Sequence, residues 1–144
     1  MAISYRNLNP GDYDNIIDVW EVSGLPARLK GRDSRENIAA HMKKQPHSFI
    51  GAFDGESLIG VVIATDDGRK GWINRLAVIP EYRGYGIARK LIRISEERLF
   101  NSGIGIISCL IMDDNSPSIG LFESEDYSSM REVLYFRKVL NEDV

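Results

Sequence analysis

The sequence predicts an α/β (α+β) fold organised around a central strand-helix-strand unit. Three segments carry this prediction: a strand over 72–79, a long amphipathic helix that begins at Ile87, and an apolar strand over 104–112. The first strand ends at Pro80, because proline cannot donate to a sheet ladder. In the helix, apolar residues recur three and four positions apart and therefore share one face. Two strands joined by such a helix form a right-handed βαβ unit whose strands are parallel.

The first half of the chain predicts two helices and a hairpin. The expected elements, in order, are a strand over 2–7, a helix from Tyr13, a helix from Ser34, and strands over 48–53 and 57–65. Both helices have apolar residues at helical spacing, and Ser34 is a residue type that favours helix starts. Asp54-Gly55 separates the two strands and is a strong turn signal, so these strands are expected to pair as a hairpin.

The C-terminal third predicts two more strands around a short helix. Residues 104–112 are nearly all apolar, as expected for a strand buried on both faces. Residues 115–125 are typical of a short helix. A final strand is expected over 132–139, with one further short strand near Ser128.

Composition and charge exclude several classes of protein. The 144 residues are expected to form a single domain over 1–144, long enough for a substantial core. The formal charge of −3 offers no global basic field for a nucleic acid, and no apolar run is long enough to cross a membrane. A single cysteine and the absence of a signal-peptide segment favour a cytoplasmic protein. His41, His47 and Cys109 have no metal-ligand spacing, so no metal is expected.

The loop before the long helix is a candidate diphosphate site. Gly84 and Gly86 lack a Cβ, which lets backbone N–H groups face a ligand. The helix N-terminus that follows has unpaired N–H groups and a dipole that favours an anion. Arg83 adds a guanidinium that matches phosphate oxygens. The dinucleotide fingerprint fails because Arg89 replaces its third glycine, and the Gly-Lys-Ser/Thr of a P-loop is absent.

This loop resembles the signature of the GCN5-related N-acetyltransferase (GNAT) family. The signature is Arg or Gln, two residues, Gly, one residue, then Gly or Ala. It matches here over Arg83, Gly84, Tyr85, Gly86, Ile87 and Ala88. The resemblance covers almost the whole chain and implies a mixed, largely antiparallel sheet of six to seven strands flanked by about four helices. It also implies that the loop amides bind the pyrophosphate of acetyl-coenzyme A (acetyl-CoA), which serves as the cosubstrate.

The resemblance assigns further cofactor contacts to two other segments. In the family, the pantetheine arm lies between splayed fourth and fifth strands and pairs with the backbone of the fourth, which here is Leu76, Ala77 and Val78. A second cofactor motif begins with Asn115 and continues through Leu121. Phe122 stands where this motif usually has a tyrosine, and that tyrosine is commonly the acid that protonates the departing thiolate.

The sequence leaves the catalytic acid and base open. Phe122 has no hydroxyl, so water, Tyr127 or Cys109 would have to donate the proton. The strand over 72–79 lacks the carboxylate that some family members use as a base. Glu21 and Asp113, together with Asp114, are candidate bases, and a chain of waters is an alternative.

The predicted function is transfer of an acetyl group from acetyl-CoA to a primary amine of a small molecule, a protein or a peptide. Arg28 and Arg32, with Lys30 between them, lie where the family usually forms part of the acceptor wall and can bind an anionic acceptor group. The alternative is an ordinary solvated basic loop. A non-catalytic acyl-CoA sensor, or a scaffold that has lost the cofactor, are alternatives for the whole protein. The resemblance also allows a homodimer.

Overall fold

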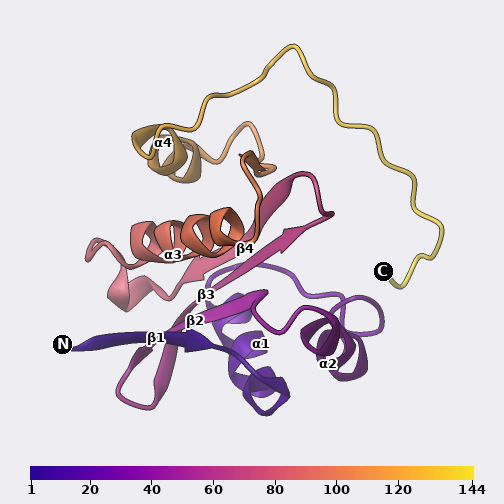
Figure 1. The fold of residues 1–144 in the computed structure, drawn as a ribbon. Coiled ribbons are helices and arrows are strands. Elements are labelled where there is room, and N and C mark those ends of the chain that lie inside the picture. Colours follow the sequence, from indigo (N-terminus) through magenta and orange to yellow (C-terminus); the bar gives the residue numbers. More distant parts are fainter.

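The structure is a five-stranded sheet with helices on both faces (Figure 1). A computed structural model describes residues 1–144. The strands lie side by side in chain order: β1 (Ile3–Asn7), β2 (Phe49–Asp54), β3 (Ser57–Asp66), β4 (Gly71–Val78) and β5 (Ile107–Ser108). All neighbours are antiparallel except β4 and β5, which are parallel. The mixed, largely antiparallel sheet and its βαβ unit are therefore confirmed.

The helices form two layers, one on each side of the sheet. Their bounds are Tyr13–Val22 for α1, Arg35–Lys44 for α2, Ile87–Asn101 for α3 and Ser116–Ser124 for α4, with short 3₁₀ turns η1 (Pro10–Asp12) and η2 (Pro80–Tyr82). Helices α1 and α2 lie on one face, and α3 and α4 lie on the other (Figure 1). Local signals set their ends: the Ser34 Oγ accepts from the N–H of Asn37 at 3.1 Å, and Gly103 follows α3 at φ +90°.

Strand β2 shows how the alternation of side chains divides the core between these layers. Phe49 and Phe53 pack with side chains of α1 and α2, whereas Ile50 and Ala52 pack beneath α3. All four are buried, because successive side chains of a strand point to opposite faces and both faces are covered here. On the α1 side the largest fully buried side chain is Trp20. Truncation of such a residue to alanine costs about 3–5 kcal/mol, so Trp20 is a main anchor of α1.

Three expectations for the C-terminal third are wrong. The sheet has five strands rather than six to seven, because residues 132–139 and the region of Ser128 form no strand. Residues 104–112 are not buried on both faces: β5 has two residues, and Ile106, Leu110 and Met112 are exposed. An extended segment becomes a strand only where a neighbour supplies hydrogen-bond partners. Since β5 is so short, it offers almost no ladder to a further strand.

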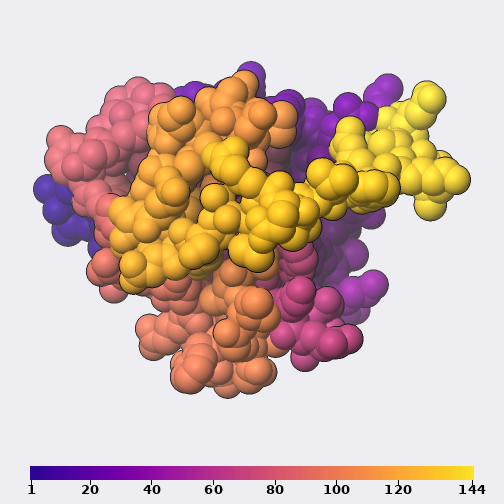
Figure 2. Space-filling view, turned by 90° about the horizontal axis from the view of Figure 1, so that it is seen from above, coloured from indigo at the N-terminus to yellow at the C-terminus, as the bar shows by residue number.

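The C-terminal segment 128–144 instead runs from α4 around the molecule to the loop between α1 and α2 (Figure 1). Figure 2 shows it crossing the surface toward the N-terminal part of the chain. There Arg28 donates to the backbone carbonyls of Glu142 and Val144, the latter at 2.8 Å. None of the helices combines the length and the apolar character that crossing a membrane would need.

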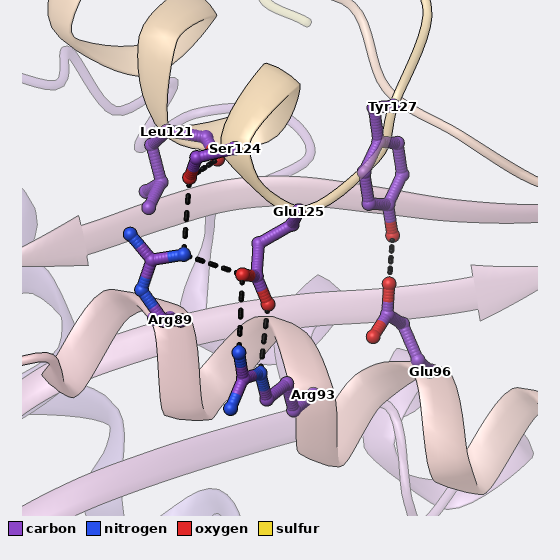
Figure 3. Close-up of polar contacts among 7 residues, drawn as sticks. All are labelled: Arg89, Arg93, Glu96, Leu121, Ser124, Glu125 and Tyr127. Carbon is purple, nitrogen blue, oxygen red and sulfur yellow. Dashed lines mark hydrogen bonds and ion pairs between the residues drawn. The ribbon is translucent and has the colours of Figure 1, made fainter.

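A cluster of ion pairs attaches the end of α4 to α3 (Figure 3). Arg93 donates to Glu125 at 2.8 Å, and Arg89 donates both to Glu125 and to the Ser124 Oγ. The Glu125 side chain is only 6% exposed. The hydrogen bond from Arg93 holds the pKa of Glu125 below its ordinary value, with a further contribution from Arg89. The carboxylate is therefore stabilised in its charged form.

Replacing Glu125 should change how stability depends on pH. The lowered pKa means that the carboxylate contributes stability above its unfolded-state pKa of about 4.3, and that this contribution is lost as the pH falls through the folded-state pKa. We expect Glu125→Gln to lower the melting temperature at pH 7, and the difference from wild type to shrink below about pH 4. Thermal melts between pH 3 and pH 8 measure this. Glu123→Gln, at an exposed position of α4, is the matched control; a Glu125 effect that stays constant across the pH range would contradict the assignment.

Candidate active site

The first feature of the site is the open edge of β4. Strand β4 pairs with β5 only through Gly71 and Trp72, whereas its pairing with β3 continues to Val78. The ladder between β4 and β5 ends at Trp72, and no residue of β4 beyond it is paired with β5. The two strands therefore diverge, and the backbone of Leu76–Val78 has no partner strand on that side. An extended molecule with amide groups can pair with such an edge as an added strand does.

The glycine loop lies at the end of this edge and has the form of an anion site. Gly84 and Gly86 have φ values of +86° and +79°, a region that other residues rarely adopt. Gly86 is the N-cap of α3, and no side chain caps the first turn, so its N–H groups are available. A Cβ built on either glycine would meet no atom within 4 Å. The space in front of the loop is therefore open.

Arg83 connects the loop to β4. Its Nε donates to the carbonyl of Val78 at 2.9 Å, and the guanidinium makes no other hydrogen bond within the protein. Tyr82 holds the preceding turn by donating to Asp54 at 2.5 Å. One N–H of Arg83 thus fixes the loop, while its terminal amino groups stay available to a phosphate.

The second predicted cofactor segment forms α4. The Asn115 Oδ1 accepts from the N–H of Ser118 at 3.3 Å and caps this helix, so the structure gives Asn115 a local role. Phe122 is 6% exposed and belongs to the same apolar cluster as Val78. Its ring meets that of Tyr127 edge to face, with centroids 5.0 Å apart. Phe122 is therefore a packing residue of the core on the α3 and α4 side of the sheet.

The two alternative proton donors are poorly suited to that task. Tyr127 donates its hydroxyl to Glu96 at 2.8 Å (Figure 3), and burial together with this hydrogen bond raises the pKa of Tyr127 far above its ordinary value. Burial also raises the pKa of the Cys109 thiol. A general acid is effective when its pKa lies near the working pH. Of the alternatives that the sequence leaves open, water is the one that this geometry favours.

The candidate bases and the basic loop lie at the surface. Glu21 and Asp113 are exposed, and neither side chain makes a hydrogen bond or an ion pair, so nothing in the structure connects them to the open edge of β4. Arg28 and Arg32 are also exposed, and Arg28 is engaged by the C-terminal segment. Their roles remain predictions.

Arg75 is the residue near the site that sequence reasoning missed. It lies in β4 directly before Leu76, and its guanidinium lies over the ring of Trp20, 4.3 Å from the centroid. Its Nη2 donates to the carbonyl of Pro26 at 2.8 Å. The available signal was a lone arginine in a largely apolar strand.

Comparison with known proteins agrees with this geometry. The profile of the acetyltransferase (GNAT) family matches residues 14–126. Acetyltransferase SG1711 of Sodalis glossinidius is 30% identical over 92% of each chain.

Two solved structures have the same fold. The PaiA N-acetyltransferase of Thermoplasma acidophilum, in complex with coenzyme A, has a TM-score of 0.76 and 22% identity, covering 87% of this chain and 89% of that one. AAC(6')-Iy, in complex with a bisubstrate analogue, has a TM-score of 0.77 and 16% identity, covering 96% and 99%. The chain therefore belongs to the acetyltransferase (GNAT) family and is an acetyl-CoA-dependent N-acetyltransferase.

Proposed function

We propose that this enzyme transfers the acetyl group of acetyl-CoA to a primary amine of a small molecule or a peptide. The observation that carries the proposal is the continuity of two features: the open edge of β4 ends at the glycine loop. One extended cofactor can therefore place its diphosphate on the loop amides and Arg83, and its pantetheine arm beside Leu76–Val78. Such an arrangement leads the thioester toward the N-terminal half of β4.

The chemistry requires little from side chains in this arrangement. Attack of the amine on the thioester carbonyl forms a tetrahedral oxyanion, which unpaired N–H groups of β4 are suited to stabilise. The nitrogen of this intermediate gives up a proton to water, and collapse then breaks the C–S bond and gives the amide and a thiolate. A thiol with a pKa of about 8.5 is a fair leaving group near neutral pH, so water can supply its proton. The attacking ammonium, with a pKa of about 10.4, must first lose a proton, and water is again the available acceptor.

The proposed acceptor class, a primary amine, is argued from the family and from the site and not from any one relative. The AAC(6')-Iy structure contains an analogue that joins coenzyme A to monomethyl-acetylneamine. At 16% identity this likeness concerns the fold alone, and a peptide amine fits the proposal equally well. The homodimer stays a prediction, which analytical ultracentrifugation can test.

The first prediction concerns cofactor binding. Acetyl-CoA should raise the melting temperature, since a ligand that binds only the folded state stabilises it. We expect Gly86→Ala to abolish most of this rise, because the new Cβ would enter the open space in front of the loop amides. Differential scanning fluorimetry over a range of acetyl-CoA concentrations gives the measurement.

Gly55→Ala is a matched control for this variant. Gly55 also has a positive φ, +61°, and a Cβ there likewise meets no atom within 4 Å. Both variants carry the same kind of backbone strain, of about 1–2 kcal/mol, but Gly55 lies in the β2–β3 turn. The control should keep the full acetyl-CoA shift. Equal acetyl-CoA thermal shifts in the two variants would show that the diphosphate does not bind to this loop.

The second prediction concerns the missing acid. If Phe122 lies beside the coenzyme sulfur, Phe122→Tyr restores a proton donor. A general acid contributes a factor of about 10²–10⁴, so kcat should rise within this range, or by less where water already serves well. The KM for acetyl-CoA should stay nearly constant, because the acid acts mainly in the transition state. Thiol release with a panel of primary amines measures both constants.

Tyr127→Phe separates this effect from a role of the neighbouring phenol. We expect this variant to be less stable, since Glu96 loses its hydrogen bond, and to keep the wild-type kcat. A large fall in kcat at constant KM would instead make Tyr127 the proton donor. Wild-type protein that shows a full acetyl-CoA shift but transfers to no amine in the panel would refute the proposed acceptor class.

A further inference from the structure

Arg75 interrupts β4 with a bulge. Val61 pairs with Ala77 and Ile63 pairs with Asn74, so Arg75 and Leu76 together lie opposite a single residue of β3. The φ of Arg75 is +53°, one of only two positive values among residues other than glycine. Backbone outliers of this kind persist only where the surrounding structure holds them, and they concentrate at functional sites.

The side chain of Arg75 connects this bulge to the end of α1. Its guanidinium stacks on Trp20 and donates through Nη2 to the carbonyl of Pro26, in the loop that follows α1. Its Nη1 makes no hydrogen bond and is not among the buried unpartnered atoms, so this end of the guanidinium remains accessible. The strand that carries the open edge is thus joined directly to the basic loop.

The unpartnered polar groups of the core gather at this same junction. Three buried side-chain atoms in the chain have no hydrogen-bond partner: Trp20 Nε1, Ser23 Oγ and Arg75 Nε. Trp20 and Ser23 lie three positions apart at the end of α1 and therefore neighbour each other, and Arg75 contacts Trp20. Trp20 is fully buried. Indole and guanidinium N–H groups can only donate, and a hydroxyl can donate as well, so the three atoms call for an oxygen-rich acceptor.

Charges of both signs surround this junction. Arg28, Lys30 and Arg32 lie in the same loop as Pro26, together with Asp33, and the acidic C-terminal residues Glu142 and Asp143 lie against that loop. The Asp33 carboxylate already accepts from the backbone N–H of Arg28 at 2.8 Å. Arg75 itself makes no ion pair, so its guanidinium charge is left for an anionic group.

The position also matches the reacting end of the cofactor. A pantetheine arm that leaves the glycine loop and follows β4 passes Val78, Ala77 and Leu76 in turn, so its next neighbour is Arg75. We propose that Arg75, Trp20 and Ser23 bind an oxyanion of the acceptor, and that the acceptor is an amine carrying a carboxylate or a phosphate. This rests on the proposed transfer to an amine and specifies its substrate class. The planar guanidinium suits both oxyanions, because it can donate two parallel hydrogen bonds.

Matched acceptor pairs test the proposal and distinguish the two oxyanions. The first pair is β-alanine and β-alaninamide, and the second is O-phosphoethanolamine and ethanolamine. Wild-type enzyme should prefer the charged member of at least one pair, and the preferred pair identifies the oxyanion. Arg75→Lys should lower kcat/KM for that charged acceptor by about 10- to 100-fold, the effect of one charge-assisted hydrogen bond, mainly through KM. The value for the neutral partner should not change.

Three further variants control for structural effects. Arg75→Asn removes the guanidinium with a residue that tolerates a positive φ, and Trp20→Phe removes the indole N–H while keeping an aromatic ring. Both should reduce the preference for the charged acceptor. Arg69→Lys, in the exposed β3–β4 turn, should leave it unchanged. The acetyl-CoA thermal shift should persist in all four variants, which shows that the fold and the cofactor site are intact.

The outcomes separate this inference from the function on which it rests. Transfer to neutral and charged amines at equal rates by wild-type enzyme would overturn the inference and leave the transfer to amines standing. An equal loss for both members of a pair in Arg75→Lys would also overturn it, since Arg75 would then be structural. Binding of acetyl-CoA without transfer to any of the four amines or to a panel of peptides would overturn the proposed acceptor class and this inference together.

Discussion

The separation of β4 from β5 is the constraint on which the rest of the site depends. Two parallel residue pairs hold the strands together, and beyond Trp72 β4 has a partner strand on one side only. Unpaired backbone groups are costly when they are buried, so this edge must face solvent or a ligand. The glycine loop and η2 follow directly, and Arg83 fixes the loop by donating to the carbonyl of Val78. The candidate site is thus the edge of β4 that has no partner strand.

The features that could be predicted from the sequence are those set by neighbouring residues. The hairpin over Asp54-Gly55, the start of α2 after Ser34 and the end of α3 at Gly103 each depend on a turn or cap signal within a few residues. The two glycines of the loop belong to this group as well, because their left-handed φ values follow from the strand-to-helix turn.

The features that could not be predicted depend on distant partners. Residues 132–139 have a strand-like composition, but a strand also needs an edge with which to pair, and β5 ends at Ser108. The same holds for Arg75, whose role depends on Trp20 and Pro26, far away in the chain. Phe122 is an intermediate case: its place in α4 followed from the pattern, whereas its burial against Tyr127 required the packed structure.

Because bound acetyl-CoA would pair with the open edge of the sheet, the stability of the protein depends on the supply of acetyl-CoA. In the free protein, β4 has no partner strand on one side beyond Trp72, and β5 is anchored by only two residue pairs. Bound acetyl-CoA would fill this gap and stabilise the closed form by mass action. In a cell, proteases act on transiently opened chains, so the half-life of the protein would lengthen when acetyl-CoA is abundant and shorten when it is scarce. The amount of enzyme would then follow the concentration of acetyl-CoA without any change in its synthesis.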